Sequence, residues 1–207
     1  MSNSDNLFDL ESNKRDHKVD ITDIAISKVP YVRYKDIPEE HYATLQELAK
    51  AVLEFSRSRN NCDETAITYS LDDPDGMLDD SGSIAVSYGV EHNVDPLNNA
   101  ISFHLMHTAG GCVIIILHNH PSLSKISLGD ISYLLGYAAL KMIVAVTNLG
   151  NINYAVKTSK YNRESALKLY RDSVAMYEKA TNLKQKQEAT EYFLNNCYQV
   201  GIHFEVC

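Results

Sequence analysis

The sequence has few cysteines, no long apolar run and no excess of positive charge, and each absence excludes a class of protein. None of the four cysteines forms a C-x-x-C pair, so a disulfide framework is not expected and a reducing cytoplasm is the expected compartment. No apolar stretch approaches the roughly 20 residues that cross a membrane, and the first thirty residues lack the apolar core of a signal peptide. The net charge of -8 argues against a broad surface for nucleic acid.

The composition that remains is that of an ordinary soluble globular protein. The chain has 207 residues, of which 44% are apolar and 22% are charged, enough for one good core with modest extensions. Residues 1 to about 25 are rich in Asp, Asn, Ser and Lys, so we expect poor order there. We therefore divide the chain into a polar, largely flexible segment over residues 1–35, a core domain over 36–158 and a helical C-terminal extension over 159–207.

Hydrophobic periodicity predicts an alternation of helices and strands in the core domain. Residues 21–34 favour extended structure, because Pro30 interrupts their apolar residues. Expected helices cover residues 39–57, 96–106 and 128–140, and two more cover about 162–177 and 185–198. Expected strands cover residues 65–71, 83–88, 112–117, 142–147 and 152–156. Such interspersed elements predict an α/β or α+β fold in which helices flank a central mixed sheet.

Two histidines close the most apolar of the expected strands. Residues two apart on a strand point the same way, so His118 and His120 are expected to project together from its end. Asp130 follows in the first turn of the next expected helix and supplies a carboxylate. Two imidazoles and a carboxylate form a three-ligand set that leaves a fourth zinc position open, which is how catalytic zinc sites are built. The sequence therefore predicts a Zn²⁺ site and, with it, an enzyme.

The order of these residues resembles the JAMM motif of the JAB/MPN-domain zinc metalloproteases. His118-x-His120-Pro121 is followed by Ser127-x-x-Asp130, and Glu64 lies upstream, before an apolar strand that ends in Leu-Asp. The loop that begins His-Asn-His-Pro-Ser is most similar to the bacterial RadC-like branch. Further similarity at residues 86–89 and 94–96 extends the resemblance over about residues 64–156, under half of the chain.

The resemblance implies a JAB/MPN-like, cytidine-deaminase-like layered fold and zinc-dependent hydrolysis of an amide bond in a protein or peptide substrate. His118, His120 and Asp130 would hold the zinc. Glu64 would take a proton from the attacking water and deliver it to the departing amine, and Ser127 would hydrogen-bond the oxygen of the tetrahedral intermediate. Zinc can lower the pKa of its water to about 7, so a nearby carboxylate has only one proton to move.

Two departures from the family pattern leave other functions open. The interval between Pro121 and Asp130 is one residue shorter than usual, and Pro96-Leu97-Asn98 replaces the branch's Pro-Arg-Glu. A zinc-stabilised binding or scaffold module without catalysis is therefore a second hypothesis. A RadC-like, DNA-associated accessory protein is a third, although the acidic charge and the lack of an evident helix-hairpin-helix module speak against it.

Structural explanations for the same residues also stay open. Ser127 and Asp130 match a helix-capping pattern, Glu64 could be a solvated residue at a strand start, and Glu91 competes with Glu64 for the role of base. An aromatic stripe on the C-terminal helices predicts packing on the core, or else a face for a homodimer or a partner protein. The stripe consists of Tyr161, Tyr170, Tyr177, Tyr192 and Phe193.

Overall fold

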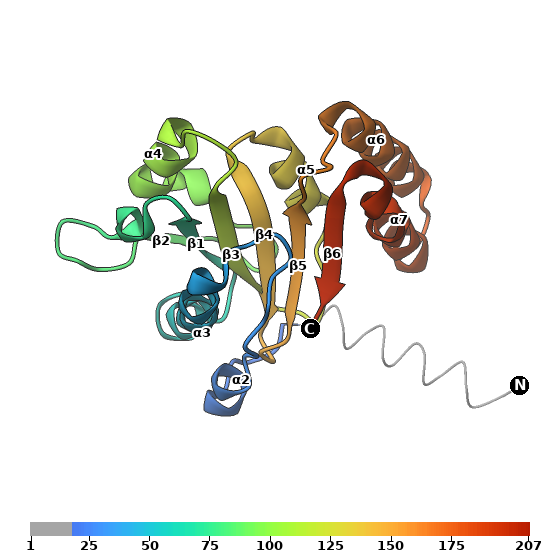
Figure 1. Ribbon diagram of the computed structural model, residues 1–207. Coiled ribbons are helices and arrows are strands. Elements are labelled where there is room, and N and C mark those ends of the chain that lie inside the picture. The colour runs from blue at the N-terminus through green and yellow to red at the C-terminus, as the bar shows by residue number, and fades with distance from the viewer. Residues whose placement is uncertain (1–17) are drawn as a thin grey trace, which may run out of the picture.

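A mixed sheet of six strands forms the centre of the α+β fold in the computed structural model, which describes residues 18–207. The strands lie in the order β2-β1-β3-β4-β5-β6 (Figure 1). The β3–β4 pair is parallel, whereas every other neighbouring pair is antiparallel. The strands are β1 (Thr65–Ser70), β2 (Val86–Tyr88), β3 (Ile114–His120), β4 (Leu140–Thr147), β5 (Ile152–Lys157) and β6 (Ile202–Val206).

Six α-helices accompany the sheet within the described part of the chain. They are α2 (Asp23–Ser27), α3 (Tyr42–Arg59), α4 (Ala100–Thr108), α5 (Leu128–Gly136), α6 (Arg163–Lys179) and α7 (Leu183–Asn196). Four short 3₁₀ turns lie between them: η1 (Glu39–His41), η2 (Pro74–Met77), η3 (Pro96–Asn98) and η4 (Cys197–Val200). Over residues 18–207, no helix has both the length and the apolar character to cross a bilayer.

The helices form a layer on each face of the sheet. Helix α3 covers one face, where Leu45 and Val52 share a core with Ile115 and Leu117 of β3. Helices α4 to α7 cover the other face (Figure 1), and their core includes Ile114 and Ile116 of β3. Successive β3 residues thus alternate between two apolar layers, as a strand buried on both faces must. The predicted sheet with flanking helices is confirmed, and so are most of its elements.

The segment before α3 differs from its predicted form. Residues 1–17 lie outside the described residues, so the prediction of flexibility there is not addressed. Over residues 18–35 the chain packs on the α3 face, where Ile21, Ile26 and Tyr34 are all buried. The prediction of extended structure is wrong over residues 23–27, because the side chain of Thr22 accepts a hydrogen bond from the Ala25 N–H and caps the short helix α2.

The C-terminal region is not a separate helical extension. Its two predicted helices are present as α6 and α7, but the chain then forms β6, which pairs antiparallel with β5. Phe193 and Ala166 are fully buried in the same core as α5. Within the aromatic stripe, Phe193 faces the core, whereas Tyr177 and Tyr192 are each 39% exposed. Residues 159–207 therefore complete the sheet and its helical layer.

Several element boundaries differ from their predicted positions: the strand predicted over 83–88 begins at Val86, and the helix predicted over 96–106 is a 3₁₀ turn followed by α4 from Ala100. Helix α5 ends at Gly136 rather than at residue 140, because Leu140 already begins β4. Strand β3 begins at Ile114, two residues later than predicted, and it extends through both histidines. Cys112 consequently precedes the strand and is exposed.

Candidate metal centre

The two histidines of β3 face the layer of α4 and α5. They continue the alternation of Ile114 and Ile116, so they leave the apolar core at the carboxyl end of the strand. Both are nearly inaccessible, with 3% of His118 and 4% of His120 exposed. Their Nε2 atoms lie 2.9 Å apart. The two-residue period of the strand thus brings the two predicted nitrogen ligands together.

Asp130 reaches the same point from the first turn of α5. Its Oδ1 lies 3.1 Å from His118 Nε2, and its Oδ2 lies 3.3 Å from His120 Nε2. The ligand atoms of the three residues all lie within 4.8 Å of one another. Among residues 18–207, this is the single cluster of at least three His, Cys, Asp or Glu side chains with such geometry.

The local structure of α5 explains how Asp130 is held there. Ser127 is the N-cap, and its Oγ accepts a hydrogen bond from the Asp130 N–H at 3.1 Å. In return, Asp130 Oδ2 accepts from the Ser127 N–H at 2.7 Å, which completes a capping box. The capping explanation is confirmed, and it does not exclude the ligand prediction, because Oδ1 of the same carboxylate remains directed at His118.

A backbone contact sets the orientation of one imidazole. His120 Nδ1 donates to the carbonyl oxygen of Ser124 at 3.0 Å. A neutral imidazole with its proton on Nδ1 presents a lone pair at Nε2, which is the form that binds a metal. His118 Nδ1 is buried and has no hydrogen-bond partner within the described residues. The Ser124 carbonyl was not foreseen from the sequence, because only the folded loop brings it to the ring.

The donor set fits a zinc ion. Two ligands of a tetrahedral zinc at 2.0–2.1 Å lie about 3.3 Å from each other. The observed separations of 2.9, 3.1 and 3.3 Å are close to that value. The two buried Nε2 atoms lie less than 3 Å apart, an arrangement that a shared positive charge, from a proton or from a metal ion, stabilises. His118, His120 and Asp130 are thus the residues that would hold such an ion.

The charges of the three residues are strongly coupled. Burial alone would raise the pKa of Asp130, but the charge of His118 and hydrogen bonds from both imidazoles hold it well below its usual value. Burial would likewise lower the pKa of His120, whereas the hydrogen bond and charge of Asp130 raise it to about 9. The carboxylate is therefore ionised at neutral pH, which is the form a metal requires.

Glu64 lies on the same side of the sheet, directly before β1. Residues two apart in an extended chain point to the same face, so the side chain of Glu64 lies on the same face as that of Ala66. Ala66 is paired with His118 in the adjacent strand. Glu64, His118, Ser127 and Asp130 line one cavity of about 290 Å³. Burial raises the pKa of Glu64, an effect that the charges of His118 and His120 oppose. Glu64 is therefore a half-buried carboxyl group beside the ligands rather than a solvated strand-start residue.

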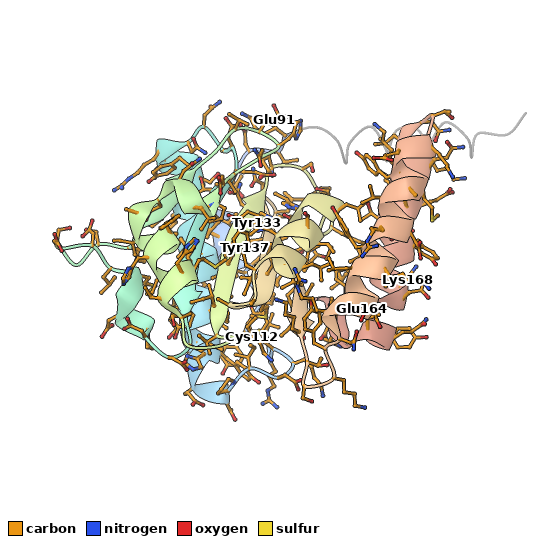
Figure 2. The ribbon with its side chains drawn as sticks, turned by 90° about the horizontal axis from the view of Figure 1, so that it is seen from above. Glu91, Cys112, Tyr133, Tyr137, Glu164 and Lys168 are labelled. Carbon is orange, nitrogen blue, oxygen red and sulfur yellow. The ribbon has the colours of Figure 1, made fainter. Side chains whose placement is uncertain are left out.

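The other wall of the cavity comes from a loop and from α5. Residues 92–96 supply most of this wall, Tyr133 of α5 completes it, and the Tyr133 hydroxyl donates to Asp95 Oδ1 at 2.9 Å. In Figure 2, Tyr133 of α5 and Tyr137, which follows the helix, lie between Glu91 and Cys112. The competing base Glu91 is not among the lining residues, although its neighbour His92 is. Sequence reasoning missed Tyr133, which a helical apolar pattern cannot distinguish from a core residue.

Ser127 lines the cavity, but its hydroxyl is already engaged. The Oγ atom donates to Asp130 Oδ2 at 2.8 Å and accepts from the Asp130 N–H. A hydroxyl has one proton to donate, so binding a substrate oxygen requires Ser127 to release Asp130. The role of Ser127 toward a reaction intermediate stays a prediction, whereas its role as helix cap is confirmed.

No known family model, curated protein sequence or solved structure matches this chain.

Proposed function

We propose that this protein is a zinc-dependent metallopeptidase or isopeptidase with a JAB/MPN-like fold, and that it hydrolyses an amide bond in a protein or peptide. The observation that carries the proposal is the meeting of four side chains from three elements. His118 and His120 from β3 and Asp130 from α5 form a donor set, and Glu64, directly before β1, lines the cavity that they open into.

In this proposal the two histidines and Asp130 would hold the ion, and Glu64 would move the proton. A bound zinc ion would supply Lewis acidity and lower the pKa of water, as it does in other hydrolases. Water adds to the amide carbonyl carbon while Glu64 takes one of its protons. Glu64 then gives that proton to the amide nitrogen, and the C–N bond breaks to release an amine and a carboxylic acid. The raised pKa of Glu64 suits this cycle, because the group must both gain and lose a proton near neutral pH.

The cavity supports a substrate with an extended, exposed chain. Its lining includes four apolar residues, Val94, Pro96, Ile116 and Ile143. Asp95 and Glu64 add acidic groups to the same lining. A cavity of about 290 Å³ accommodates one or two residues on either side of a scissile bond rather than a folded domain. A flexible tail or a lysine-linked branch of a protein fits this requirement.

The experiment that tests the proposal compares E64Q with wild type, both loaded with one zinc ion per chain. The substrates are a library of fluorogenic peptides and of isopeptides linked through lysine side chains. We expect hydrolysis by wild type and a loss of at least about 100-fold in kcat for E64Q, the range typical for a lost general base. Zinc content, measured by elemental analysis, is expected to be equal in both.

E91Q is the matched control, because Glu91 lies in the neighbouring loop but does not line the cavity. Its activity is expected to equal that of wild type. Two results contradict the proposal: a zinc-loaded wild type that cleaves no member of the library, or an E64Q variant that is as active as wild type. The first result favours a zinc-stabilised binding module instead, and the second means that Glu64 is not the base.

A further inference from the structure

A fully buried amide side chain lies between the two histidines. Asn119 is 0% exposed and points to the α3 face of the sheet, opposite to His118 and His120. The other β3 side chains on that face, Ile115 and Leu117, are apolar. Filling the core would need only another apolar residue at this position, so the amide has a different task.

The Asn119 side chain forms hydrogen bonds with the two residues that flank Glu64 in the sequence. Its Oδ1 accepts from the Thr65 N–H at 2.8 Å, and its Nδ2 donates to the Asp63 carbonyl at 3.2 Å. The same Nδ2 group lies 3.1 Å from Ser56 Oγ. The residues immediately before and after Glu64 are thus tied to the strand that carries the two imidazoles.

These bonds take over where the sheet ladder stops. The last β1–β3 pair is Ala66 with His118, so the ladder does not extend to Thr65 or Glu64. On its other side, the Glu64 backbone pairs with a loop: its N–H donates to the Val90 carbonyl, and its carbonyl accepts from the Gly89 N–H. The Asn119 side chain therefore substitutes for the missing ladder bonds between Glu64 and β3.

A second buried amide keeps Asn119 in place. Asn148, which follows β4 and is also 0% exposed, accepts from Asn119 Nδ2 at 2.8 Å through its Oδ1. Asn148 Nδ2 donates to the carbonyls of Val19 and Cys62 at 2.7 and 3.1 Å. The Asn148 backbone N–H donates to the His120 carbonyl at 3.0 Å. The pair of amides is thus fixed to β3, to the residues before Glu64 and to the N-terminal segment.

We propose that Asn119 is a positioning residue: it holds the Glu64 carboxyl group at a fixed place relative to the imidazoles of the adjacent strand. The inference rests on the proposed function in that it assigns Glu64 to proton transfer. Asn119 itself faces away from the cavity and does not line it. Its replacement therefore disturbs the placement of Glu64 and leaves the ligand set and the substrate surface intact.

The test uses N119A, which removes the bonds to Asp63 and Thr65, and N119D, which has the same size and keeps only the acceptor. S173A is the matched control, because Ser173 is a buried donor to the Leu169 carbonyl in α6, away from the site. Each full-length variant is loaded with Co²⁺ for its visible spectrum and with Zn²⁺ for kinetics. Unfolding curves confirm that the assayed protein is folded.

We expect kcat to fall roughly 10- to 100-fold in N119A, since a misplacement of about 1 Å at a reacting group costs about 100-fold. The KM and the Co²⁺ spectrum are expected to match those of wild type. The kcat of N119D is expected to lie between those of N119A and wild type, and this variant keeps the inference testable if N119A does not fold. S173A is expected to keep the wild-type kcat.

A measurement without zinc separates this inference from the proposed function. The ¹³C resonance of the Glu64 carboxyl group in metal-free protein is expected to move in N119A and to stay unchanged in S173A. If E64Q is as active as wild type, the proposed function fails, but this resonance still tests whether Asn119 positions Glu64. A Glu64 resonance that is identical in N119A and wild type overturns the inference. So does a folded, zinc-loaded N119A with wild-type kcat, or a loss of activity explained by a changed Co²⁺ spectrum.

Discussion

Zinc is expected to stabilise the fold through Asp130, and the capping serine beside it allows a sharp test. Asp130 is the third residue of the capping box and, in the proposed site, would also be a metal ligand, so a simple loss of stability in an Asp130 variant would not separate the two roles. Ser127 takes part in the capping box through its bonds with Asp130, but it is not one of the three possible metal ligands. We therefore compare D130N and S127A with wild type, each with and without zinc.

The size of the effect follows from mass action. A ligand that binds only the folded state stabilises it by about 4 kcal/mol at a free concentration 1,000 times its Kd. For a chain of this length, 1 kcal/mol shifts the Tm by about 2–4 °C, so zinc is expected to raise the wild-type Tm by about 8–16 °C. Loss of the N-cap costs about 1 kcal/mol, so S127A is expected to melt about 2–4 °C lower with or without zinc.

D130N is expected to lose most of the zinc-dependent increase, because an amide replaces the anionic ligand and one of the three donors is weakened. Calorimetry of the metal-free and zinc-loaded proteins measures all six melting temperatures. A zinc-dependent increase in D130N as large as that of wild type would refute the assignment of Asp130 as a ligand. An increase that disappears in S127A would show that the cap, and not the carboxylate, controls binding.

Three further predictions concern other parts of the molecule. Burial lowers the pKa of Lys157 to about 8, from 10.5 in the unfolded chain, so folding disfavours the charged form of this side chain. As the pH rises from 8 to 10.5, the free energy of unfolding of wild type should therefore increase by up to about 3 kcal/mol relative to that of K157M, as measured by urea unfolding. A Cβ on Gly89 would lie 2.1 Å from the Asn93 carbonyl oxygen, so G89A should displace the cavity loop and lower kcat/KM by roughly 100-fold, with zinc content unchanged. F193A should lower the free energy of unfolding by about 3–5 kcal/mol, because Phe193 is fully buried. Y192A, which changes its exposed neighbour, should alter that free energy by no more than about 0.5 kcal/mol. Equal urea midpoints for these two variants would contradict the packing of α7.

The convergence of the three donors could be predicted because it depends on short-range geometry. His118 and His120 share a face through the two-residue period of a strand, and Asp130 occupies the first turn of a helix whose cap is visible in the sequence. The folded chain then needs only one loop, residues 121–127, to bring the carboxylate to the imidazoles. That Glu64 lies at the same cavity was inferred from the family resemblance, since residue patterns alone give no distance between β1 and β3.

Features that depend on distant pairing were not foreseen. Residues 202–206 alternate apolar and polar, yet the pattern is only five residues long, and its place beside β5 depends on how α6 and α7 fold back. The contact between Asn119 and Asn148 requires the parallel pairing of β3 and β4, which no local pattern encodes. Helix α2 is one turn long, and its burial comes from the α3 face rather than from its own propensity.

The polar end of β3 also bears on how the strand finds its register. Residues 114–117 are all apolar, so either set of alternate side chains could face either apolar layer of the protein. This run alone therefore does not oppose a shift of β3 by one residue against its neighbouring strands. Such a slip would turn His118 and His120 toward the apolar α3 layer and place Asn119 beside Asp130, which leaves buried polar groups without their partners. Unpaired buried groups of this kind cost about 1–3 kcal/mol each. The residues of the candidate site therefore also select the native pairing of the central strand, which makes their substitution costly to folding even where no metal is bound.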